Sequence, residues 1–257
     1  MASWAAASVA YFLYIGGVAA FLPRLTPAAR LRVAAVAVAG LGVALAGGYA
    51  TAFWARSVVW PPVALLLAYW ASGLVWTGPM PRIEAWLSDS DIRLGIPRVV
   101  ARIPRWLILV LEGAYAGVYP IIPIALVLHL WFSPGADADR FWLVVLITDF
   151  VCFGMLPWIQ TRPPRALEAV QPWSSGLRSF NVSLLGRLSI GVNTVPSGHA
   201  AEALAAALLL SDAPAGVAVW MWAAAAAISA GAVFGRYHYA VDAFAGWIVA
   251  LIVWNAL

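Results

Sequence analysis

Long apolar runs recur along most of this chain, each close to the length that a helix needs to cross a bilayer. A helical span takes roughly 20 mostly apolar residues, and a lipid-exposed segment is helical because its backbone hydrogen bonds must be made internally. Only 10% of the 257 residues are charged and 64% are hydrophobic, against ~25% charged residues in a typical soluble domain. The sequence therefore predicts an all-α integral membrane protein.

About eight spans are expected, which makes the predicted fold a polytopic transmembrane helix bundle. The candidate runs are 3–22, 31–53, 58–77, 106–132, 141–159, 197–210, 215–234 and 239–257. A count of seven results if the second and third runs divide differently around Arg56 and Pro61. We predict an additional N-terminal hairpin at residues 1–57 and a core with six helices at residues 58–257.

Residues 80–105 differ from the apolar runs because charged and apolar side chains alternate in them. The charged members are Arg82, Glu84, Asp89, Asp91, Arg93, Arg98, Arg102 and Arg105. This mixture favours amphipathic helical pieces on a membrane surface, broken at Gly95 to Pro97. The alternative is an ordinary cytoplasmic loop.

All fifteen basic residues are arginine. If the eight spans alternate in direction, thirteen arginines fall on one side and only Arg56 and Arg140 on the other. The positive-inside rule then places the N-terminus outside and the polar motifs on the cytoplasmic side. We expect an integral protein of a cell membrane, in the simplest case a bacterial inner membrane. No basic soluble domain is present to bind nucleic acid.

The polar segment 236–242 follows an apolar run and places His238 four residues before Asp242. On a helix these two side chains share one face. A carboxylate there accepts a hydrogen bond from Nδ1–H of the imidazole, which leaves the Nε2 lone pair free for a nucleophile or base. The alternative is a histidine that caps the preceding span, with an unrelated aspartate below it.

A second polar segment, Pro-Ser-Gly-His at 196–199, precedes another apolar run and indicates a helix start. We expect free backbone N–H groups at Ser197 and Gly198, which attract phosphate, with His199 in the first turn. Plain helix capping by the serine is the alternative. Glu202, three residues after His199, is expected either to tune or relay its proton or to hydrogen-bond between helices.

Thr-Arg-Pro-Pro-Arg at 161–165 is the third polar segment. Prolines stiffen the backbone after Arg162, so its guanidinium is a candidate phosphate clamp. A membrane-flanking charge is the alternative for Arg162. Arg165 is expected to be a surface charge, with an accessory role in phosphate binding as the alternative. Glu112 and Asp149 lie within apolar runs and are expected to face the bundle.

These three segments, in this order and each at a span boundary, resemble the type-2 phosphatidic acid phosphatase superfamily over about residues 106–257. The resemblance implies phosphoryl transfer through a phosphohistidine. It implies these roles: His238 as nucleophile, His199 as general acid, Asp242 as orienting carboxylate, and Arg162, Ser197 and Gly198 as phosphate ligands.

Two positions depart from the family pattern. Met155 stands where the family has a lysine, and Ala232 stands where it has an arginine. Arg236 can replace that arginine if a loop or helix start lies near His238.

The runs at 162–165 and 236–239 resemble the branch that includes inositol phosphorylceramide synthases, which transfers a phosphoryl-alcohol group between lipids.

Three functions remain open at this point. They are hydrolysis of a lipid phosphate, headgroup transfer to an acceptor alcohol, and an inactive protein that binds or transports lipid. The expected partners are a lipid phosphate substrate, membrane lipids and, for transfer, an acceptor alcohol. We expect neither a metal nor a cofactor, because three dispersed histidines make no convincing metal site.

Overall fold

The computed structural model describes residues 1–133, 135–168 and 173–257 and confirms the all-α class. An isolated bridge joins Thr161 to Asn193. In the described chain the helices are α1 (Ser3–Phe21), α2 (Pro27–Tyr49), the π-helical turn η1 (Ala55–Val59), α3 (Trp60–Leu74), α4 (Pro81–Arg93), α5 (Ile96–Val100), α6 (Arg105–Ala116), α7 (Val118–Phe132), α8 (Ala138–Gly154), α9 (Pro164–Leu167), α10 (Gly176–Leu188), α11 (Gly198–Leu209), α12 (Ala215–Phe234) and α13 (Ala240–Ala256).

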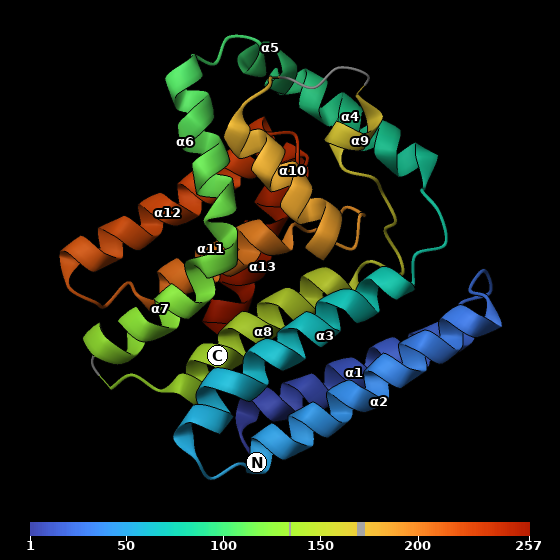
Figure 1. Ribbon diagram of the computed structural model, residues 1–257, viewed down its shortest axis with the longest axis vertical. Coiled ribbons are helices and arrows are strands. Elements are labelled where there is room, and N and C mark those ends of the chain that lie inside the picture. Colours follow the sequence, from blue (N-terminus) through green and yellow to red (C-terminus); the bar gives the residue numbers. More distant parts are fainter. Residues whose placement is uncertain (134, 169–172) are drawn as a thin grey trace.

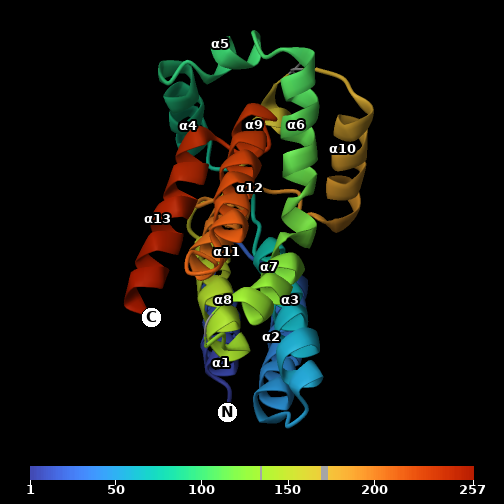
Figure 2. The ribbon, with the colours of Figure 1, turned by 90° about the vertical axis from the view of Figure 1, so that its left-hand side faces the viewer.

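The helices form two groups (Figure 1). Helices α1, α2, α3 and α8 lie side by side in the first group. Helices α6, α7, α11, α12 and α13 make up most of the second, and α4 and α5 lie across its end (Figure 2). Helix α8 also contacts α11 and α13, so it joins the two groups.

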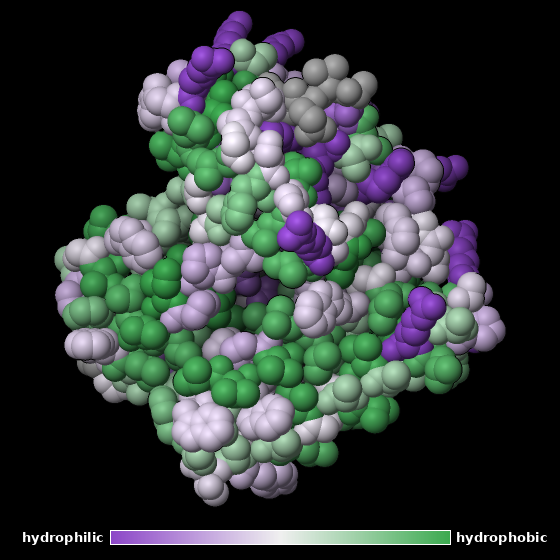
Figure 3. All heavy atoms as spheres, viewed as in Figure 1, coloured by the Kyte–Doolittle hydropathy of each residue, from purple (hydrophilic) through white to green (hydrophobic). Residues whose placement is uncertain are grey.

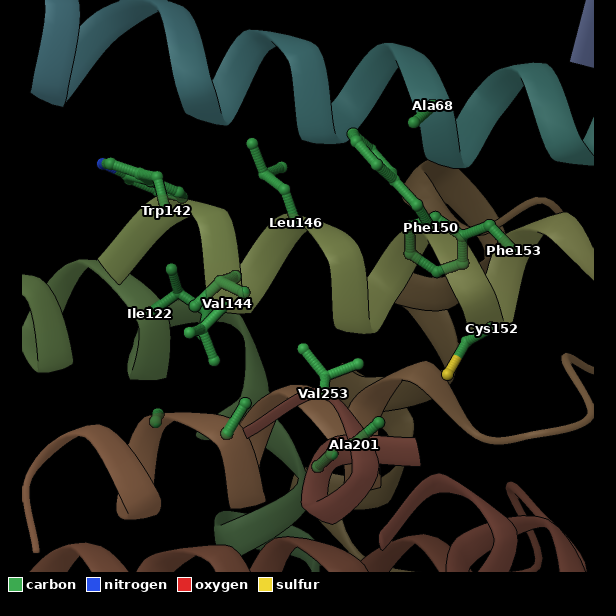
Figure 4. Packing of buried hydrophobic residues seen from close by; sticks show 14 of the residues in the cluster. Ala68, Ile122, Trp142, Val144, Leu146, Phe150, Cys152, Phe153, Ala201 and Val253 are labelled. Atoms are coloured by element: carbon green, nitrogen blue, oxygen red, sulfur yellow. The ribbon is translucent and has the colours of Figure 1, made fainter. Parts of the chain in front are cut away.

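Helix α8 is packed from both sides. Trp142 and Leu146 point toward α3, whereas Val144 and Cys152 point toward the second group (Figure 4). Twelve of its seventeen residues are buried. Because lipid tails are as apolar as these side chains, the packing stabilises the fold in the bilayer by van der Waals contact more than by release of water.

Helix α11 lies at the centre of the second group, against α7, α8, α12 and α13. Its sequence is rich in alanine, and small residues let helix backbones approach closely in membrane proteins. Ten of its twelve residues are buried. The two that are only partly buried are His199 and Glu202, and they are three residues apart on one face of the helix.

The run expected as one span at 106–132 is two helices. Helices α6 and α7 meet at Gly117 with a bend of 63°. Pro120 stands in the first turn of α7, where a missing N–H is tolerated, whereas inside a continuous helix it would remove a hydrogen bond and clash with the preceding turn. The proline therefore explains why a new helix begins here.

The expected number of about eight spans was too high. Four helical stretches are long and apolar enough to cross a membrane, and the bent α6–α7 pair brings the number to five within the described residues. The runs at 141–159, 197–210 and 239–257 form helices of only 17, 12 and 17 residues. Twelve residues extend about 18 Å, well short of the ~30 Å hydrocarbon core.

The segment at 80–105 forms two helices, α4 and α5, separated at Gly95 as expected. Gly95 has φ 74°, a left-handed conformation that glycine adopts without steric cost. The outer face of the segment exposes Trp86, Ile92, Leu94 and Val99, and hydrophilic side chains gather at this end of the molecule (Figure 3). Its exposed arginines are residues 82, 93, 98, 102 and 105.

Candidate active site

His238 lies in a short turn between two helices. Helix α12 ends at Phe234 and α13 begins at Ala240, so the helix start expected near His238 is confirmed. The N–H groups of Tyr237 and His238 both donate to the carbonyl of Ala232, at 2.9 Å. Ala232 is therefore part of the backbone support of the histidine turn.

Arg236 precedes this turn in a left-handed conformation, with φ 62°, which is uncommon for a residue other than glycine. Its guanidinium is held by Asp91 at 2.5 Å and by Glu168 at 2.7 Å. The N–H of Arg165 donates to its carbonyl at 3.0 Å. The guanidinium of Arg236, which was predicted from the sequence to bind phosphate, is thus paired with two carboxylates.

The Pro-Ser-Gly-His motif starts a helix, as predicted. Ser197 is the N-cap of α11 and accepts from the N–H of Ala200 at 3.4 Å. The two amides expected to be free have partners, since Ser197 donates to the Asp242 carbonyl at 2.9 Å and Gly198 to Thr194 Oγ1 at 3.4 Å. Close packing of α13 on this turn explains the difference.

The two motif histidines meet although they come from different helix starts. The ring centroids of His199 and His238 are 5.8 Å apart and their planes are nearly perpendicular, at 88°. The two motifs are therefore parts of one site.

Asp242 lies beside His238 but serves first as a helix cap. The distance from His238 Nδ1 to Asp242 Oδ2 is 3.7 Å, longer than a hydrogen bond. The same oxygen accepts from the N–H of Tyr239 at 3.0 Å and from Asn193 Nδ2 at 2.8 Å. At this distance an ionised Asp242 is still close enough to stabilise a positive imidazole.

A small cavity lies between the two histidines. Its lining includes Tyr69, Tyr115, Phe153 and Leu185, from four different helices, and Tyr237 from the turn before α13. Its polar lining residues are Arg165, Ser189, Thr194, Gly198, His199 and His238. A cavity that combines apolar walls with convergent polar groups is the usual form of a small-molecule site.

The structure separates the two arginines of the 161–165 segment. Arg162 donates from Nε and Nη2 to Glu84, at 3.0 and 2.9 Å, and its side chain is 44% exposed. These hydrogen bonds hold the pKa of Glu84 below its ordinary value. Arg165 instead lines the cavity, with its guanidinium 5.3 Å from the centre of the Tyr237 ring.

Three polar residues that support the motifs were missed from the sequence. Glu84 and Asp91 bind motif arginines, and Asn193 joins Asp242 to Thr161 Oγ1, at 2.8 and 3.1 Å. A signal for the acidic pair existed, because Glu84 and Asp91 are seven residues apart and share one face of α4, the face that is buried. Asn193 carries no comparable signal.

Glu112 faces the bundle, as expected, and organises one wall of the cavity. It accepts hydrogen bonds from Arg178 at 3.0 Å, Asn181 at 2.7 Å and Tyr237 at 2.7 Å. Tyr237 in turn stacks on Tyr115 with ring centroids 3.8 Å apart. This buried network fixes the residue immediately before His238.

Burial lowers the pKa of His238 well below its ordinary value, and the nearby charges of His199 and Arg165 act in the same direction. The imidazole is therefore neutral over a wide pH range. A neutral ring with an exposed lone pair is the form that attacks an electrophile. Within the described ranges, no three His, Cys, Asp or Glu side chains are grouped to hold a metal ion.

An all-helical bundle with apolar membrane-length helices and two histidines across a small cavity defines a membrane protein with a histidine-based site. The chain belongs to the PAP2 superfamily, which matches residues 82–256 and whose members are generally phosphatases. Comparisons with curated proteins and with solved structures give no match. The match begins after α3, so the domain boundary expected at 57/58 stays a prediction.

Proposed function

We propose that this protein transfers the phosphoryl group of a lipid phosphate ester through a phosphohistidine at His238. The 5.8 Å approach of the His199 and His238 rings at one cavity carries the proposal. Two imidazoles that meet at one cavity can act on the same phosphoryl group, one to attack phosphorus and one to protonate the group that leaves.

In the first step, Nε2 of His238 forms a bond to phosphorus as the bond from phosphorus to the ester oxygen breaks. His199 gives a proton to that oxygen, which leaves as the alcohol. In the second step, the oxygen of water or of an acceptor alcohol attacks phosphorus, its proton passes to His199, and His238 is released. General acid help of this kind is typically worth ~10²–10⁴ in rate.

Arg165 is our candidate for the residue that offsets the charge of the transferring phosphoryl group. It lines the cavity with both histidines, and electrostatic stabilisation by preorganised groups is usually the largest catalytic contribution. Arg162 and Arg236, the ligands expected from the sequence, are engaged by Glu84 and by Asp91 with Glu168. In this arrangement they secure the turns that carry the site.

Hydrolysis and headgroup transfer share the same phosphoenzyme and differ only in the acceptor. Purified protein should therefore be given lipid phosphates with and without a lipid alcohol, and both inorganic phosphate and the transfer product should be measured. We expect His238→Ala to be inactive and to form no acid-labile phosphoenzyme, and His199→Ala to be severely impaired. Full activity of His238→Ala would overturn the proposal.

We also propose that the site faces the cytoplasm and that α4 and α5 lie at the membrane surface. The exposed arginines of residues 82–105 and the motif turns are at one end of the molecule, joined by the contacts of Glu84 and Asp91. In a Cys152→Ser background, Arg93→Cys should resist an impermeant maleimide in intact cells, whereas Asp212→Cys at the far end of α11 should react. The reverse pattern would refute this orientation.

A further inference from the structure

His199, the general acid of the proposed mechanism, lies beside the carboxyl group of Glu202. His199 and Glu202 are the partly buried residues of a helix that is otherwise buried. The distance from His199 Nδ1 to Glu202 Oε1 is 3.4 Å. The same ring packs edge-on against Tyr115 and His238, with centroids 5.9 and 5.8 Å away. Glu202 thus lies near Nδ1 of His199, and Nε2 remains available on the side of the cavity.

A second carboxyl group stands behind Glu202. Asp149 on α8 is fully buried, and neither of its oxygens accepts a hydrogen bond from an N–H or hydroxyl of the described residues. One of these oxygens lies beside the Pro-Ser-Gly-His turn, since a Cβ added at Gly198 would be 3.4 Å from Oδ1. Gly198 and Glu202 are four residues apart on α11, so the carboxyl group of Glu202 lies on the same helix face, toward Asp149, and the two groups interact.

Two neighbouring carboxyl groups in this apolar interior cannot both carry a negative charge at acceptable cost, so at least one of them keeps a proton. The titratable groups facing the pair are Cys152, Tyr119 and His199, and none of them is a permanent cation. A hydrogen bond between the two carboxyls therefore requires Asp149 or Glu202 to be protonated. Asp149 is the more deeply buried of the two, which favours the neutral form there.

His199 needs such a partner. A general acid must carry its proton when substrate binds, yet burial disfavours the charged imidazolium and Arg165 and His238 add no negative charge nearby. Among the described residues Glu202 is the carboxylate within 4 Å of the His199 ring. When Glu202 is ionised, its negative charge favours the protonated ring.

We propose that Asp149, Glu202 and His199 form a hydrogen-bonded chain that keeps the general acid charged and oriented. Asp149 donates its carboxyl proton to Glu202, and Glu202 accepts Nδ1–H of His199, so that Nε2–H points to the leaving oxygen. That Nε2 proton moves to the alcohol in the first step and is replaced from water or the acceptor in the second. The proton of the carboxyl pair is not consumed, and Asp149 and Glu202 are positioning residues.

This inference rests on the proposed function, and leaving-group dependence separates the two. An alkyl phosphate needs a proton on the departing alkoxide, whereas p-nitrophenyl phosphate expels a stable anion and needs little acid help. We expect Glu202→Gln to lower kcat for the alkyl phosphate about 10²-fold and to change kcat for p-nitrophenyl phosphate less than about threefold. Asp149→Asn should show the same selectivity with a smaller loss.

The control is Thr148→Val, a change of similar size at a buried neighbour of Asp149 on the same helix. It should leave the ratio of the two rates unchanged. In Glu202→Gln the basic limb of the pH profile should also move to lower pH, because an imidazolium without its carboxylate loses its proton more readily. Glu202→Asp, which retains the charge, should restore part of the alkyl phosphate rate and carries the test if Glu202→Gln does not fold.

Equal losses on both substrates, with an unmoved pH profile, would show that the carboxyl pair has only a structural role. That result would leave the proposed function intact as long as His199→Ala discriminates between the substrates and His238→Ala is inactive. Activity in His238→Ala would instead remove the proposed function, whatever Glu202→Gln does.

Discussion

His238 and Asp242 are 3.7 Å apart, measured from Nδ1 to Oδ2, and the carboxylate is already held by Asn193 and the Tyr239 amide. The aspartate is thus fixed before it acts on the histidine. Its position is set by the start of α13, and the His238 ring lies over it from the preceding turn.

Because the pKa of His238 is lowered, we expect the acid limb of the pH profile of kcat/KM to lie at unusually low pH. Because burial, His199 and Arg165 lower this pKa, His238 should remain neutral below the ordinary value of ~6.5. We expect kcat/KM to fall on the acid side only well below pH 6.5. Arg165→Gln removes a positive neighbour, so in that variant the acid limb should move to higher pH. A shift to lower pH would contradict the assigned cause.

The two arginines of the 161–165 segment should behave differently. Arg165→Gln should lower kcat/KM by about 10²–10³-fold, as expected for the loss of a group that stabilises transition-state charge. Arg162→Gln removes an ion pair between a partly exposed guanidinium and the buried Glu84, and it should retain most activity because Arg162 does not line the cavity. Steady-state kinetics of both variants decide between Arg165 and Arg162 as the phosphate ligand.

Asp91 should be essential for stability. It binds Arg236 and also accepts from the N–H of Ala240 at 2.9 Å. Asp91→Asn leaves Arg236 with Glu168 alone, and breaking a buried ion pair costs about 3–5 kcal/mol. Asp89→Asn, two residues away and exposed, should change the free energy of unfolding by less than about 0.5 kcal/mol. Equal thermal stabilities of the two variants in detergent would rule out this role.

Gly246 permits the contact between α13 and the Pro-Ser-Gly-His turn. A Cβ at this position would lie 2.4 Å from the carbonyl oxygen of Ser197, so Gly246→Ala should destabilise the protein by about 1–3 kcal/mol and reduce activity. At Gly17 on α1 no atom lies within 4 Å of an added Cβ. There the same change should stabilise by roughly 0.5–1 kcal/mol, because alanine is the better helix former. Unfolding in detergent measures both.

Much of the local organisation could be predicted from the sequence. The helix start at Ser197, the break near His238 and the interruption at Gly95 follow from proline, glycine and polar residues at the ends of apolar runs. The burial of Glu112 and Asp149 was also predictable, because a carboxyl group in an apolar run is costly in contact with lipid.

The number of spans was less predictable, since hydropathy does not mark where an apolar helix ends. Residues 155–159 continue the apolar run of α8, yet the helix ends at Gly154 and residues 155–158 form turns. The bend at Gly117 likewise lies within one hydrophobic run. A sum of hydropathy over 20 residues cannot distinguish a full span from a short helix covered by its neighbours.

The sequence by itself determined the helical class, the apolar character and the order of three polar motifs, because these follow from local composition and spacing. Only the tertiary structure decided which side chains share a site. Glu84 pairs with Arg162, 78 residues away in the sequence, and Asp91 pairs with Arg236, 145 residues away. Of the three arginines, Arg165 is the one that lines the cavity. Such pairings depend on how helices pack, and helix packing is set by the whole bundle.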